Sequence, residues 1–206
     1  MGERIGLYGG SFDPIHFGHL ISARSVAEQL DFSRIILIPS ARPPHKPTAA
    51  VIDARHRLEM ARLAVAGDPL FEVSEVELHR AGPSYSIDTV DELGRQLGDQ
   101  CDLFWIIGAD SLPELATWHR IGELLDRIRI VTAARPGFVV PDVTSLEAKV
   151  GAPAVEKLIS DRFRTPEIDI SATGIRQRVR KGRSVRYLTP SPVAEYIARE
   201  GLYGKA

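Results

Sequence analysis

Apolar residues along this chain alternate between short continuous runs and longer stretches with helical spacing. Continuous runs of mainly Ile, Leu and Val occupy residues 5–8, 34–39, 103–107 and 128–131. Uninterrupted apolar runs of this length are typical of parallel strands that are covered on both faces. Between the first two runs, apolar residues recur three or four positions apart over residues 20–30, which predicts a helix. The chain therefore begins with a βαβ unit.

The same helical spacing predicts three more helices. The first is expected after the capping residue Asp53, and its apolar face comprises Leu58, Ala61 and Val65. The second is expected after Ser86 as its N-cap, with an apolar face made of Ile87, Val90, Leu93 and Leu97. The third is expected to open at Pro192, to stop at Gly201 and to pack on the sheet without carrying chemistry.

Two stretches have a less regular pattern. Residues 71–78 alternate apolar and polar side chains, which predicts a half-exposed strand at the edge of the ligand region. Residues 139–155 have weak periodicity and two prolines, and we expect a variable loop with room for one short helix. The whole pattern predicts an α/β fold with a doubly wound, mostly parallel sheet in a single domain of residues 1–206. Its C-terminal helical part is expected to begin near residue 171.

Composition narrows the class of protein. The 206 residues carry a formal net charge of −1, with 44% hydrophobic and 26% charged residues, as in ordinary soluble globular proteins. Nucleic acid is therefore not an expected partner. The chain shows no apolar signal core and no stretch long enough to span a bilayer, so we expect a cytoplasmic protein without a membrane partner. The single cysteine, Cys101, is expected to be a packed residue, because no neighbouring base suggests an activated thiol.

The stretch between the first strand and the first helix carries candidate chemistry. Gly9 and Gly10 open this first loop (residues 9–16), and their lack of Cβ atoms lets a ligand approach the backbone. His16 and His19 are three residues apart, so both imidazoles can project from one side of the first helical turn. A helix N-terminus has unpaired N–H groups and a partial positive charge, which favour a bound phosphate. The first loop is therefore predicted to handle phosphate.

Other interpretations of this loop are weaker. The two histidines and Asp13 can be read as zinc ligands, but no further ligand cluster occurs at a suggestive spacing. A dinucleotide fingerprint needs Gly-x-Gly-x-x-Gly and an acidic residue after the second strand. Here the glycines are adjacent and the second strand ends at Pro39-Ser40. The glycines can also serve only to make a turn.

The motif His-x-Gly-His after a glycine-rich loop resembles the nucleotidyltransferase superfamily. The longer sequence that starts at Gly9, Gly-Gly-Ser-Phe-Asp-Pro-Ile-His-x-Gly-His, resembles the bacterial nicotinate mononucleotide adenylyltransferases. Residues 168–176 are similar to the second signature of that family, with Ala172 in place of its middle serine. Weaker matches cover residues 44–46, 85–89, 108–110 and 135–137, with Ser86 where the family commonly has threonine.

The resemblance implies a Rossmann-like nucleotidyltransferase fold and a reaction of ATP with nicotinate mononucleotide. The implied ATP contacts are Gly9, Gly10, Ser11, Phe12, His16, His19, Gly108, Asp110, Ser171, Thr173 and Arg176. The implied mononucleotide contacts are Lys46, Tyr85, Ser86, Thr89, Asp110, Trp118, His119 and Arg135. The expected catalytic residues are His16, His19 and Arg176. Mg²⁺ is expected to be carried on the ATP phosphates, with no metal site built by the protein.

Several alternatives stay open at the level of sequence. Arg55, His56 and Arg57 are better read as a solvated helix face than as ligands. The six basic residues between Arg176 and Arg186 can form either a solvated helix face or a cradle for a triphosphate. The acceptor can instead be nicotinamide mononucleotide, phosphopantetheine or FMN. A different class of function is that of a nucleotide-binding sensor without catalysis. A homo-oligomer is not excluded.

Overall fold

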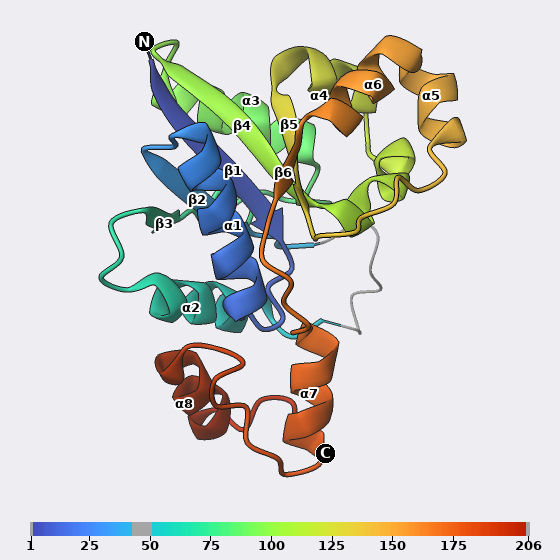
Figure 1. Ribbon diagram of the computed structural model, residues 1–206. Helices are drawn as coiled ribbons and strands as arrows, with labels where there is room; N and C mark the ends of the chain where they lie inside the picture. The colour runs from blue at the N-terminus through green and yellow to red at the C-terminus, as the bar shows by residue number, and fades with distance from the viewer. Residues whose placement is uncertain (1, 43–50, 205–206) are drawn as a thin grey trace.

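A six-stranded sheet forms the centre of the computed structural model, which describes residues 2–42 and 51–204 (Figure 1). The strands lie in the order β3-β2-β1-β4-β5-β6, and every neighbouring pair is parallel. Their bounds are β1 Glu3–Gly10, β2 Arg34–Pro39, β3 Phe71–Val73, β4 Cys101–Gly108, β5 Arg129–Ala134 and β6 Arg162–Arg164. The continuous apolar runs of the sequence are therefore the central strands, as predicted.

Helices cover both faces of this sheet. Their bounds are α1 Phe17–Leu30, α2 Ala54–Val65, α3 Ser86–Leu97, α4 Ile121–Arg127, α5 Thr144–Val150, α6 Ala152–Ser160, α7 Ala172–Arg180 and α8 Ser191–Arg199. Two short 3₁₀ helices, Ala109–Ser111 and Pro113–Thr117, follow β4. Helices α1 and α2 share one apolar cluster with the sheet, and α3 to α6 share the other. The predicted doubly wound α/β class is confirmed.

The chain reverses its direction of travel across the sheet at β1. Strands β2 and β3 lie on one side of β1, whereas β4, β5 and β6 lie on the other (Figure 1). In open parallel sheets, ligands bind outside the carboxyl ends of the strands at such a reversal. The carboxyl ends of β1 and β4 therefore locate the place where a site is expected.

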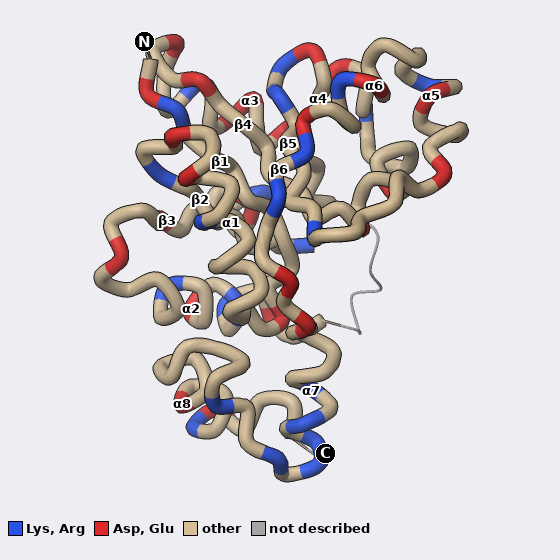
Figure 2. The backbone as a smooth tube through the Cα atoms, in the orientation of Figure 1, with Lys and Arg blue, Asp and Glu red and all other residues tan. Residues whose placement is uncertain are grey.

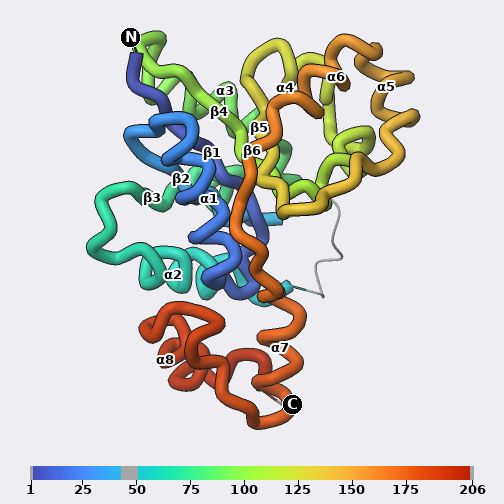
Figure 3. Tube along the Cα trace, viewed as in Figure 1, coloured from blue at the N-terminus to red at the C-terminus, as the bar shows by residue number. Residues whose placement is uncertain are grey.

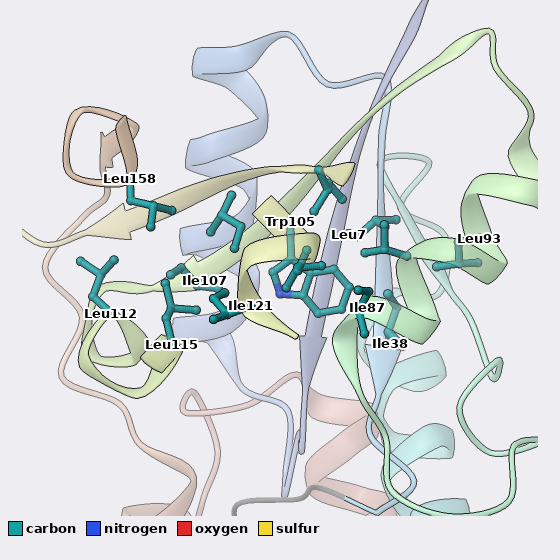
Figure 4. Packing of buried hydrophobic residues seen from close by; sticks show 14 of the residues in the cluster. Leu7, Ile38, Ile87, Leu93, Trp105, Ile107, Leu112, Leu115, Ile121 and Leu158 are labelled. Carbon is teal, nitrogen blue, oxygen red and sulfur yellow. The ribbon is translucent and has the colours of Figure 1, made fainter. Parts of the chain in front are cut away.

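Strict alternation along each central strand divides the core into two clusters. In β1, Ile5 and Leu7 face the helices α3 and α4, whereas Gly6 faces the rings of Phe32 and the side chain of Ile106. In Figure 4 the indole of Trp105 lies among the aliphatic side chains of the first cluster. The first cluster is built mainly from Ile, Leu and Val, whereas the second combines such residues with several aromatic rings, so apolar burial holds the sheet from both faces.

Three predicted elements need correction. The strand expected over residues 71–78 ends at Val73, because the chain then turns, with the N–H of Val76 bonded to the Ser74 hydroxyl at 3.3 Å. The expected cap Ser86 is instead the first residue of α3, whose N-cap is Tyr85 without a side-chain cap bond. The region 139–155 holds all of α5 and the start of α6, rather than a loop with one short helix.

The position of α8 also differs from the prediction. It packs on α2 rather than directly on the sheet, and the Tyr196 hydroxyl lies 2.8 Å from Nδ1 of His56. Figure 3 shows the segment after β6 running past α1 to α7, beyond the end of the sheet. The predicted N-cap of α2 is confirmed, since the Asp53 carboxylate accepts the N–H of Arg55 at 2.8 Å. The single-domain organisation stays a prediction.

Two absences hold for residues 2–42 and 51–204. No helix there combines the length and the apolar character that crossing a bilayer requires. No three His, Cys, Asp or Glu side chains in these ranges gather closely enough to hold a metal ion.

The close approach of Phe32 to Gly6 gives a stability prediction. A Cβ at Gly6 would lie 2.8 Å from the Phe32 ring and 2.9 Å from Ile106, so Gly6→Ala should destabilise the protein by about 1–3 kcal/mol through overpacking. Gly122, in α4, has nothing within 4 Å of such a Cβ, so Gly122→Ala should stabilise by about 1 kcal/mol. Urea unfolding of both variants checks this. Equal effects of the two substitutions would contradict it.

Candidate active site

The first loop passes directly over aromatic rings. A Cβ at Gly9 would lie 2.7 Å from the indole of Trp105, so only glycine lets β1 approach β4 in this way. Phe12 is buried with a positive φ of 45°, an unfavourable backbone conformation for a residue with a side chain. Its ring meets that of His19 edge-on, with 5.2 Å between ring centroids. Packing of the Phe12 ring thus helps to fix the shape of the loop.

His16 and His19 lie together at the start of α1. His16 is the N-cap residue, and the two imidazole rings stack with 3.7 Å between centroids. The backbone N–H of His16 donates to Nδ1 of His19 at 3.2 Å, which leaves the proton of a neutral His19 ring on Nε2. The sequence prediction that both rings share one side of the first turn is confirmed.

Burial keeps His16 neutral. His16 is 6% exposed, and desolvation lowers the pKa of its imidazole from 6.5 to about 4. Its Nδ1 is buried and has no hydrogen-bond partner among the described residues. A Cβ at Gly18 would lie 2.9 Å from this atom, so glycine at the centre of the His-x-Gly-His motif makes room for the ring.

A cleft of about 570 Å³ opens at the carboxyl ends of β1 and β4. The segment 165–172, which leads to α7, and the loop that follows β5 form its other walls. The predicted site residues that line this cleft are Gly9, Gly10, Ser11, Phe12, His16, His19, Gly108, Asp110, Trp118, Arg135 and Ser171. Residues from five separate stretches of the chain therefore converge on one cavity. Asp110 lies within the 3₁₀ helix after β4, whose N-cap is Gly108.

Other predicted residues lie outside the cleft lining. Tyr85 and His119 stack on each other with 4.2 Å between ring centroids, which joins the start of α3 to the segment after Trp118. Ser86 follows Tyr85 as the first residue of α3. Thr173 lies in the first turn of α7. Lys46 lies outside the described residues.

The prediction that Thr89 contacts the mononucleotide directly needs correction. Its side chain is fully buried, and its hydroxyl donates to Oε1 of Glu77 at 2.9 Å and accepts from Arg80 at 3.0 Å. Glu77 is itself buried, and desolvation raises the pKa of its carboxyl. Thr89 therefore supports the turn before α3 from within and has no surface to offer to a ligand.

Arg176 reaches back to the first loop. Its Nη1 donates to the backbone carbonyl of Asp13 at 2.6 Å, and its Nη2 donates to the Thr173 hydroxyl at 3.1 Å. The Asp13 carboxylate also accepts the hydroxyl of Tyr203 at 2.7 Å, and burial beside this carboxylate raises the pKa of Tyr203. The C-terminal part of the chain is thus bonded to the loop that carries the histidines.

Ser171 caps the start of α7. The Ser171 hydroxyl accepts the N–H of Gly174 at 3.1 Å, so the helix begins as the sequence indicated. Figure 2 shows basic residues along α7 and the loop after it. Most of this basic run is exposed, and Arg178 donates to the carbonyl of Ser184 at 2.9 Å. The solvated-face interpretation therefore fits most of the run, with Arg176 as the exception.

Arg57 is the residue that sequence reasoning misplaced. It was expected on a solvated helix face, but it is 1% exposed and donates to the backbone carbonyl of Ser11 at 2.7 Å. A signal for burial was present, because Arg57 precedes Ala61 and Val65 at intervals of four along the apolar face of α2. The prediction gave more weight to the charge of Arg57 than to its position on the apolar face of α2. Arg55 is exposed, as expected, and His56 is half-buried against Tyr196.

Known proteins with similar sequences identify the family of this chain. Residues 7–178 match the model of the cytidylyltransferase-like family, so the class of protein is a nucleotidyltransferase. A Thermus thermophilus protein named probable nicotinate-nucleotide adenylyltransferase is 44% identical, over 97% of this chain and 99% of that protein. A Moorella thermoacetica protein of the same name is 40% identical, over 97% and 91% of the two chains. The chain belongs to the nicotinate-nucleotide adenylyltransferase family.

Solved structures support the fold at lower sequence identity. Plasmodium falciparum nicotinic acid mononucleotide adenylyltransferase complexed with NaAD gives a TM-score of 0.74 at 17% identity, over 98% of this chain and 97% of that chain. A Vibrio parahaemolyticus protein described as a putative nicotinate-nucleotide adenylyltransferase gives 0.67 at 19% identity, over 98% and 95%. The architecture is therefore shared well beyond the range of close sequence similarity.

The depressed pKa of His16 predicts a loss of stability in acid. The unfolded chain takes up this proton below pH 6.5, but the folded protein resists it until about pH 4. The contribution is thus complete above pH 6.5 and falls by roughly 3 kcal/mol as the pH drops to 4. Urea unfolding at several pH values should show this slope flattened in His16→Gln. The exposed His79 serves as control, and a slope equally reduced in His79→Gln would contradict the assignment.

Proposed function

We propose that this protein transfers the adenylyl group of ATP to nicotinate mononucleotide and releases pyrophosphate, a late step in making NAD. The observation that carries this proposal is the stacked pair His16 and His19 at the start of α1, in the same cleft as Asp110 and Trp118. This cleft offers donors for phosphate beside a planar aromatic side chain for a heterocycle. A reaction that consumes ATP fits the cytoplasmic location that the sequence predicted.

The mechanism needs positioning rather than a covalent intermediate. A phosphate oxygen of the mononucleotide attacks the α-phosphorus of ATP in line, and the bond from this phosphorus to the oxygen of the leaving pyrophosphate breaks. Neutral His19 donates from Nε2 and neutral His16 from its protonated ring nitrogen to the phosphate oxygens as charge moves toward the leaving group. Arg176, bonded to the first loop through Asp13, is the proposed cationic partner of the pyrophosphate. Mg²⁺ supplies further charge neutralisation when it is bound on the phosphates.

Acceptor choice is assigned to the region around Trp118. Its indole lines the cleft and is held edge-on by Trp105, with 6.3 Å between ring centroids. A pyridine ring stacked on Trp118 would bring its substituent toward the backbone near Ser86 and His119. N–H donors there suit a carboxylate, whereas an amide would set its own NH₂ donor against them and leave both unpaired. The acid form is therefore the proposed substrate.

Pyrophosphate release is the direct test of the proposed function. The protein is incubated with ATP and magnesium, and with nicotinate mononucleotide, nicotinamide mononucleotide or no acceptor. We expect the rate of pyrophosphate release with nicotinate mononucleotide to exceed the rate with nicotinamide mononucleotide by at least about tenfold. This ratio corresponds to the free-energy cost of leaving one polar group unpaired. A preference for the amide would overturn the account of Ser86 and His119. ATP binding without release in any reaction would point to a sensor.

His19 provides the sharpest test of the phosphate assignment. His19→Ala removes a donor that is aimed at the charge that develops during transfer, so kcat should fall by about 100-fold. The exposed His79→Ala serves as the matched control and should keep the parent activity. Turnover of His19→Ala within about twofold of the parent, or only ~0.4 kcal/mol, would remove His19 from the mechanism.

A further inference from the structure

A buried guanidinium lies under the first loop. Arg57, on α2, is 1% exposed and is the largest of the fully buried side chains. Burial of a charge without polar partners is strongly unfavourable, so a buried arginine has to be fully bonded to its surroundings. Desolvation lowers the pKa of Arg57, and the nearby Asp13 carboxylate opposes that effect. The side chain remains charged, since arginine is not deprotonated in proteins.

The partners of Arg57 come from three separate segments. Nη1 donates to the Ser11 carbonyl at 2.7 Å, Nε to the Ile52 carbonyl at 3.0 Å, and Nη2 to the Ala41 carbonyl at 3.4 Å. Ser11 belongs to the first loop, Ala41 follows β2, and Ile52 precedes α2. One rigid, planar group therefore joins both ends of the connection between β2 and α2 to the loop that carries the histidines.

The bond to Ser11 bears on the orientation of the loop. A peptide carbonyl and the following N–H point in opposite directions in a trans peptide, so the Phe12 N–H points away from Arg57. Phe12 is also the loop residue with a positive φ, a conformation that persists only where surrounding contacts hold it. The hydrogen bond of Arg57 to Ser11 is such a contact, and both Ser11 and Phe12 line the cleft.

We propose that Arg57 is a positioning residue, which holds the Ser11–Phe12 peptide in the orientation that ATP binding and transfer require, without touching either substrate. This inference rests on the proposed function. The competing role is one in general stability only, in which the rest of the loop keeps its shape without the guanidinium.

Two substitutions separate these roles. Arg57→Lys keeps the charge but replaces three bonding nitrogens with one, and Arg57→Met keeps much of the volume without charge or donors. Arg55→Lys, on the same helix with an exposed side chain, is the matched control. Each variant is measured for thermal stability, for kcat and KM with ATP and the acceptor varied separately, and for amide hydrogen exchange.

We expect Arg57→Lys to lower kcat/KM for ATP by at least about tenfold, because small displacements of a positioned group have large effects on rate. The KM for the mononucleotide should rise less than the KM for ATP, since its proposed contacts other than Lys46 lie outside the segments that Arg57 joins. Amides of residues 9–13 and 40–42 should exchange faster, while those of β4 and β5 stay protected. Lower thermal stability with unchanged kcat/KM and no local rise in exchange would overturn the proposal.

The exchange measurement keeps this inference separate from the proposed function. If the parent protein releases no pyrophosphate, the proposed function fails, but a local rise in exchange at residues 9–13 still supports the positioning role, and its absence overturns that role. If Arg57→Met does not fold, the comparison is made on Arg57→Lys, which retains the charge. Any change that also appears in Arg55→Lys counts against the assignment.

Discussion

Parallel pairing of β1 with β2 on one side and with β4 on the other is the constraint on which this structure depends. It places the carboxyl end of the first strand at the point where the sheet changes direction, with no neighbouring crossover to cover it. The approach of the strands to aromatic rings is equally strict, because Gly6 and Gly9 lie against Phe32 and Trp105 without space for a Cβ. The cleft is therefore a result of how the central strands pack.

Polar groups around the cleft are arranged by burial. His16 is uncharged because it is desolvated, Arg57 is charged but surrounded by carbonyl oxygens, and the Asp13 carboxylate is bonded to Tyr203. Arg57 and Asp13 thus have hydrogen-bond partners within the protein itself. A site built in this way keeps its hydrogen-bond donors oriented before a ligand arrives, which is what phosphoryl and nucleotidyl transfer demand of a protein that forms no covalent intermediate.

Much of this arrangement could be predicted from the sequence, because it depends on local pattern. The bounds of β2, the Asp53 cap and the shared orientation of His16 and His19 follow from spacing alone. The predictions that were wrong concern residues whose partners lie elsewhere in the sequence. The burial of Arg57 requires carbonyls from three segments, and α8 lies on α2 because His56 and Tyr196 meet across 140 positions. The hydroxyl of Thr89 is bonded to Glu77, a partner that lies 12 positions earlier in the chain.

The bond between Tyr203 and Asp13 joins residues that are 190 positions apart. During synthesis on a ribosome, the loop that contains Asp13 is made before this partner, because 190 positions separate the two residues. At typical rates of translation the delay is roughly 10–40 seconds. During this interval the Asp13 carboxylate lacks the hydroxyl group of Tyr203, which donates to it in the folded protein. Completion of the cleft thus depends on a residue that is translated long after the loop itself.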